Sequence, residues 1–75
     1  MREARITYND LSIHHYVSEI TALNDLKNKL DFIYGEDITL KLEAYYEKNK
    51  ELKFDIIAFK SDWEYGKVGI LEVLK

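Results

Sequence analysis

Residues 18–35 read SEITALNDLKNKLDFIYG, and this stretch decides the fold because its apolar residues recur at three- and four-residue spacings. Ser18 or Thr21 supplies an N-cap oxygen, and Gly35 provides the residue type that ends a helix in the left-handed conformation. The pattern therefore predicts one amphipathic helix with its polar residues outside. Its predicted buried stripe consists of Ile20, Leu23, Leu26, Leu30 and Ile33.

Before the helix, residues 3–18 alternate between apolar and polar side chains and predict a β-hairpin with a two-residue turn at Asn9-Asp10. The turn fixes which side chains face the core. In the predicted register Tyr8 lies opposite Leu11, Ile6 opposite Ile13 and Ala4 opposite His15, while His14 and Tyr16 lie on the outer face with Arg5.

After the helix, alternation over residues 38–46 and 52–58 predicts a second hairpin with its loop around residues 48–50. The predicted core face consists of Ile38, Leu40, Leu42, Ala44, Tyr46, Leu52, Phe54, Ile56 and Ala58. The other face also carries Tyr45, Ile57 and Phe59, an apolar group that a sheet covered on one side does not need to expose.

The C-terminal segment admits two interpretations. Ser61-Asp62-Trp63-Glu64 resembles a capping box that starts a helix, but Gly66 and Gly69 would weaken that helix, and the apolar run that follows favours a strand. We therefore predict an α+β fold in which a small single-layer antiparallel sheet packs on one helix, in the order ββαβββ. The order ββαββα is the alternative.

Length and composition limit the classes of protein. A chain of 75 residues predicts a single compact domain over residues 1–75. The sequence has no cysteine, which excludes disulfides and thiolate metal sites and favours the cytoplasm, and it has no apolar run that would predict a membrane span. Its net charge of −3 favours basic or neutral partners and disfavours nucleic acid.

No group of residues indicates a reaction. Neighbouring strand residues point to opposite faces, so His14 and His15 cannot converge on one metal ion. Glu36-Asp37 follows the end of the helix, and no partner residue is present that would separate the pKa values of the two carboxyl groups, as acid–base catalysis requires. The chain also has neither a nucleophile elbow nor a glycine-rich phosphate loop. We expect a protein without catalytic residues, cofactor or metal.

The aromatic residues instead predict binding to another protein. Trp63 and Tyr65 lie in the segment 61–66 between the fourth and fifth predicted elements, where Trp63 docks either onto the protein's own core or onto a partner. Such side chains give a large contact area at low entropic cost. The predicted partner-binding surface consists of Trp63, Tyr65, Tyr45, Ile57 and Phe59, ringed by Glu43, Asp55, Asp62 and Glu64, and it suits a partner with a basic rim. The predicted function is that of a small acidic protein-binding module of the inhibitor, neutraliser or adaptor type.

Two other hypotheses use the same surface. In the first, the apolar face closes a homodimer and so adds to the small core. In the second, Tyr16, Tyr45 and Phe59 stack the bases of single-stranded nucleic acid or a nucleotide-like ligand on the sheet.

Overall fold

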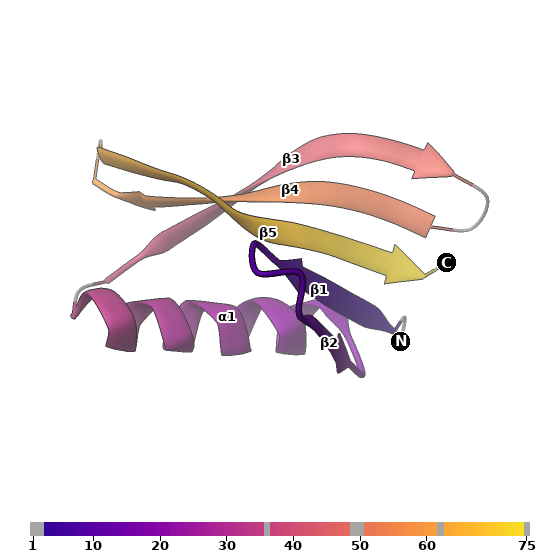
Figure 1. Cartoon of the computed structure of the whole chain (residues 1–75), viewed down its shortest axis with the longest axis horizontal. Helices are drawn as coiled ribbons and strands as arrows, with labels where there is room; N and C mark the ends of the chain where they lie inside the picture. Colours follow the sequence, from indigo (N-terminus) through magenta and orange to yellow (C-terminus); the bar gives the residue numbers. More distant parts are fainter. Residues whose placement is uncertain (1–2, 36, 49–50, 62, 75) are drawn as a thin grey trace.

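The computed structural model describes residues 3–35, 37–48, 51–61 and 63–74, with only the backbone for residues 44–48. One antiparallel sheet, with strand order β2-β1-β5-β4-β3, lies against a single helix (Figure 1). This is the predicted α+β fold in the order ββαβββ, and the helical alternative for the C-terminus is wrong. The elements are β1 (Ala4–Tyr8), β2 (Ile13–Tyr16), α1 (Glu19–Tyr34), β3 (Thr39–Lys48), β4 (Glu51–Lys60) and β5 (Trp63–Leu74).

Helix α1 has the two predicted ends. The Ser18 hydroxyl accepts a hydrogen bond from the backbone N–H of Thr21 at 3.2 Å. Gly35 is left-handed, with φ of 68°, and its N–H donates to the carbonyl oxygen of Asp31 at 2.8 Å. Local capping chemistry therefore fixes the helix at both ends.

The buried stripe of α1 differs from the predicted one. Ala22, Leu26 and Leu30 form it, whereas Ile20 and Ile33 are each 69% exposed. Ile20 precedes Ala22 by two residues, a rotation of about 200° that carries it away from the sheet. Ile33 lies at the C-terminal end of α1, where the sheet twists away from the helix (Figure 1).

The first hairpin has a different register from the predicted one. Ala4 pairs with Tyr16 and Ile6 with His14, one residue away from the expected partners. The loop has a third residue, because Tyr8 N–H donates to the Ser12 carbonyl oxygen at 2.9 Å, and Leu11 takes a left-handed φ of 71°.

Asp10 stabilises this longer loop, since its carboxylate accepts hydrogen bonds from the backbone N–H and the hydroxyl of Ser12. A shift of one residue turns every β2 side chain to the other face of the sheet. His15 is therefore exposed instead of covering Ala4, whereas His14 meets the Tyr8 ring edge-on at 4.9 Å and Tyr16 is half-buried. The exposed fractions of Leu11, Ile13 and Val17 are 81%, 55% and 68%.

The core lies between α1 and the inner face of the sheet. The described part of the predicted second-hairpin core is confirmed: Ile38, Ile56 and Ala58 are fully buried, and Leu40, Leu42, Leu52 and Phe54 are half-buried against them. The other buried members of the cluster are Ala4, Ile6, Ala22, Leu26, Leu30, Leu71 and Val73. The β3–β4 hairpin reaches past the N-terminal end of α1, which gives the molecule its elongated shape of 36 × 22 × 21 Å (Figure 1).

Candidate functional site

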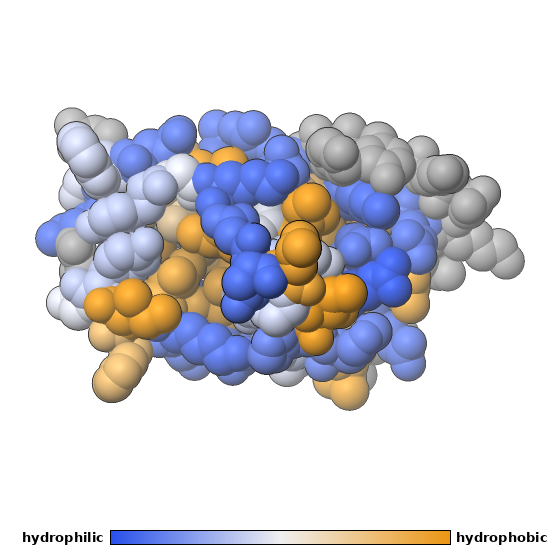
Figure 2. Space-filling model, in the orientation of Figure 1, coloured by the Kyte–Doolittle hydropathy of each residue, from blue (hydrophilic) through white to orange (hydrophobic). Residues whose placement is uncertain are grey.

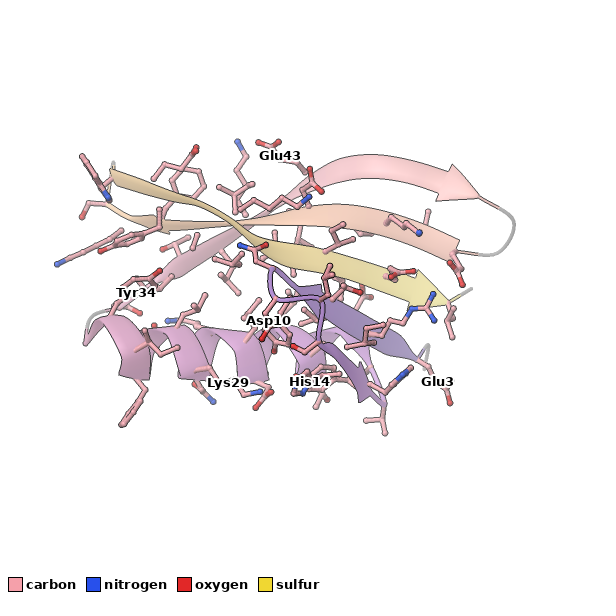
Figure 3. The ribbon with its side chains drawn as sticks, in the orientation of Figure 1. Glu3, Asp10, His14, Lys29, Tyr34 and Glu43 are labelled. Carbon is pink, nitrogen blue, oxygen red and sulfur yellow. The ribbon has the colours of Figure 1, made fainter. Side chains whose placement is uncertain are left out.

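Exposed apolar side chains gather at the end of the molecule where α1 finishes and β5 begins. Trp63, at the start of β5, is 67% exposed, and Phe32 and Ile33 on the last turn of α1 are 89% and 69% exposed. The ring of Tyr65 stacks on the ring of Tyr34, with centroids 4.4 Å apart and planes 20° from parallel. We call Phe32, Ile33, Tyr34, Trp63 and Tyr65 the aromatic end; in Figure 2 hydrophobic residues lie at the lower left of the molecule, below paler ones, and Figure 3 labels Tyr34.

The pairing of β4 with β5 explains how Tyr65 reaches the helix. Ala58 lies opposite Gly66 and Phe59 opposite Glu64, so Tyr65 is an extra residue in β5. Gly66 accommodates this bulge with a φ of 97°. The bulge breaks the strict alternation of β5, which allows Tyr65 to stack on Tyr34.

Of the other predicted surface residues, Phe59 and Glu64 lie opposite each other on β4 and β5 at this end, whereas Ile57 is buried. The register partners of Ile57 are Lys41 and Lys67, whose aliphatic stems are long enough to cover it. Phe59 is half-buried and Glu64 is exposed. The side chain of Tyr45 and all of Asp62 lie outside the described residues.

The predicted acidic ring is also divided. Glu43 is exposed on the face of β3 turned away from α1 (Figure 3), and Asp55 lies opposite it on β4. Asp55 is half-buried, and its Oδ1 lies 3.4 Å from Nζ of Lys67. Neither residue therefore belongs to the aromatic end.

On the outer face of the sheet, opposite charges are matched across three strands. Nη2 of Arg5 lies 2.7 Å from Oε2 of Glu72, and Nζ of Lys53 lies 3.6 Å from the same oxygen. Glu72 is only 7% exposed, and its hydrogen bond from Arg5 keeps the pKa of its carboxyl below the ordinary value. This row of charges holds β1, β5 and β4 together.

A second polar cluster joins β2 to α1, and the sequence analysis did not foresee it. The Tyr16 hydroxyl donates to Oδ2 of Asp25 at 2.6 Å and lies 3.3 Å from the Tyr8 hydroxyl. Lys29 pairs with the same Asp25 oxygen at 3.0 Å, and its ammonium lies 5.6 Å from the centre of the Tyr8 ring.

Burial and then the hydrogen bond to Asp25 raise the pKa of Tyr16 far above its ordinary value. The hydrogen bond from Tyr16 and the one from Lys29 lower the pKa of Asp25. The cluster thus fixes Tyr16 between β2 and α1, where it cannot stack a base on the outer face as the nucleic-acid hypothesis requires. Only the corrected hairpin register brings these residues together.

The described residues contain no group of three or more His, Asp or Glu side chains that could hold a metal ion. Nor does the described part of the chain include a helix that is long and apolar enough to cross a membrane.

Comparisons with protein-family models, with curated proteins and with solved structures found no match to this chain.

Proposed function

We propose that this chain is a small, non-catalytic, acidic protein-binding module of the inhibitor, neutraliser or adaptor type, and that it binds its partner protein through the aromatic end. The observation that carries the proposal is the exposure of Trp63, at 67%, two residues before Tyr65, whose ring stacks on that of Tyr34. Large side chains exposed together are characteristic of interaction surfaces.

The aromatic end is also preorganised for binding. Trp63 belongs to a strand paired with β4, and the Tyr34–Tyr65 stack fixes two further rings by contact between α1 and β5. Binding therefore orders few additional side chains, so less conformational entropy is lost when the apolar area is buried against the partner.

The partner that suits this end has an apolar pocket for Trp63 and basic groups around it. Glu64 is exposed next to Trp63, and the chain carries a net charge of −3, both of which favour a basic rim on the partner. As part of the proposal, the module acts in the cytoplasm, since a chain without cysteine suits a reducing compartment.

The test compares Trp63→Ala and Phe32→Ala with wild type. Partners are first captured with the wild-type chain, and the affinity of a captured protein for each variant is then measured by isothermal titration calorimetry. We expect each substitution to weaken binding by about 2 kcal/mol or more. Circular dichroism checks that the fold is unchanged.

Val17→Ala is the matched control, because Val17 is 68% exposed and lies at the other end of α1. It leaves the affinity unchanged if binding uses the aromatic end. Equal affinity of wild type, Trp63→Ala and Phe32→Ala would contradict the assignment of this surface.

A further inference from the structure

Strand β3 offers a long free edge. It is the last strand in the order β2-β1-β5-β4-β3, and within the described parts of the chain it pairs only with β4 (Figure 1). Proteins ordinarily block such an edge with proline, lysines, a β-bulge, an inward-pointing charge or a covering segment, because its unpaired N–H and C=O groups can bind another strand. The sequence has no proline, and the one register shift in β3 falls between Ala44 and Tyr46, so pairing is regular from Thr39 to Ala44.

Two charged side chains along this regular stretch lack a salt-bridge partner among the described residues of one copy. Lys41 and Glu43 are both exposed on the outer face, and among the described residues neither forms a salt bridge. Glu43 lies directly opposite Asp55 on β4, a pairing of like charges that is unfavourable across strands. A cation placed on the free side of β3, opposite Glu43, would offset this repulsion.

The inner face of the same stretch is apolar. Leu40 and Leu42 are half-buried, and a cleft of about 330 Å³ lies between α1 and β3, lined in part by Leu23, Ile38 and Leu40. A strand added at the edge of β3 would extend the apolar inner face of the sheet beside this cleft.

We propose that two copies of this chain pair antiparallel through their β3 edges, with Leu42 on the two-fold axis. In this register Lys41 lies opposite the partner's Glu43, Glu43 lies opposite the partner's Lys41, and the two Leu42 side chains meet on the inner face. The sheets of the two copies then form one continuous sheet.

A second copy is the occupant that the charges favour. A two-fold interface must be complementary to itself. Lys41 and Glu43 lie symmetrically about Leu42, so the lysine of each copy meets the glutamate of the other. The inference does not rest on the proposed function, because the pairing uses neither Trp63 nor Phe32.

The first test is a charge exchange measured by sedimentation equilibrium. Lys41→Glu and Glu43→Lys each place like charges opposite each other at two symmetry-related positions, so each variant alone should raise the dissociation constant of the dimer about tenfold. An equimolar mixture of the two variants restores both opposite-charge pairs in the heterodimer and should recover wild-type association. Glu3→Lys, an equal change of charge on an exposed residue of another segment, should leave the dissociation constant unchanged.

The second test traps the register with a disulfide. The sequence has no cysteine, so Leu42→Cys can form only the symmetric bond between two copies, and cross-strand neighbours lie close enough for it. Leu40→Cys is the matched control on the same face, because its two copies would lie about 13 Å apart, at four residues along the strand. Mild oxidation should yield a covalent dimer from Leu42→Cys and a monomer from Leu40→Cys.

A wild-type chain that sediments as a monomer up to millimolar concentration would overturn the proposal. A dimer whose dissociation constant is unchanged in both charge variants would overturn it as well. A dimer abolished by Trp63→Ala would also overturn it and would place the contact at the aromatic end. Loss of partner binding in Trp63→Ala with an unchanged dimer would separate the two surfaces.

Discussion

The Tyr16 hydroxyl ties β2 to α1. It donates to Asp25 at 2.6 Å, whereas the Tyr8 hydroxyl is 3.3 Å from Tyr16. Because a hydrogen bond to a carboxylate is stronger than one between neutral groups, we expect Tyr16→Phe to lower the free energy of unfolding by about 1 kcal/mol.

Urea denaturation followed by circular dichroism measures this loss. Tyr8→Phe is the control, since it removes the longer contact between two hydroxyls, keeps the bond from Tyr16 to Asp25 and should cost less. Equal losses in the two variants would mean that the bond to Asp25 does not hold the hairpin.

Glu72 links the stability of the protein to pH. Its carboxyl is nearly buried, and the hydrogen bond from Arg5 lowers its pKa in the folded state below the ordinary value of 4.5. The unfolded chain therefore binds the proton at higher pH than the folded chain does. The stabilisation is fully present above the ordinary pKa and is lost as the pH falls through the lowered one.

We expect the free energy of unfolding of the wild-type protein to fall as the pH is lowered from about 5 to 3, and that of Glu72→Gln to fall less steeply. Urea titrations at several pH values measure both curves. Glu3→Gln, which removes an exposed carboxylate, should keep the wild-type slope. Parallel curves for wild type and Glu72→Gln would exclude a contribution from Glu72.

At the scale of elements, local signals predicted α1 and the second hairpin, but not the register of the first. Ser18 and Gly35 act within one turn of the helix, so their sequence positions suffice to place its ends. The loop length of the first hairpin depends on two hydrogen bonds from Ser12 to Asp10, which a count of turn residues does not reveal. One additional loop residue reversed the faces of His14 and His15.

Leu11 gives a direct test of this loop. A left-handed φ costs a residue with a β-carbon about 1–2 kcal/mol, and Leu11 is 81% exposed, so its side chain contributes little burial. Leu11→Gly should therefore raise the free energy of unfolding by roughly 0.5 kcal/mol, after the greater entropy of glycine in the unfolded chain is subtracted.

Thermal and urea denaturation of Leu11→Gly and Val17→Gly form the comparison. Val17 is also exposed but has no positive φ, so glycine there should lower stability by roughly 0.5–1 kcal/mol. If both variants lost stability to the same extent, the left-handed conformation of Leu11 would be contradicted.

The candidate site was harder to predict than the fold, because its geometry depends on contacts between distant elements. Trp63 and Tyr65 stood out in the sequence as a pair of large aromatic residues. Tyr34 did not, since only the bulge at Tyr65 lets the ring of Tyr65 stack on it. Ile57 occupies a position that alternation assigned to the exposed face, yet it is buried.

At the scale of the whole molecule, the buried core and the exposed aromatic end are separate. Leu26 is 1% exposed inside the core, whereas Ile33, seven residues later on the same helix, is 69% exposed. Truncating a buried leucine costs about 2–5 kcal/mol, which approaches the entire stability expected of so small a domain. Truncating an exposed isoleucine costs about 0.5 kcal/mol or less.

We therefore expect Leu26→Ala to abolish cooperative urea unfolding and Ile33→Ala to retain the wild-type transition, as followed by circular dichroism. Ile33→Ala is then also informative about binding, because any affinity it loses cannot be attributed to a lost fold. A large destabilisation by Ile33→Ala would mean that the end of α1 is covered in solution. In that case the aromatic end would be an internal contact of the assembled protein, and its partner surface would have to be sought elsewhere.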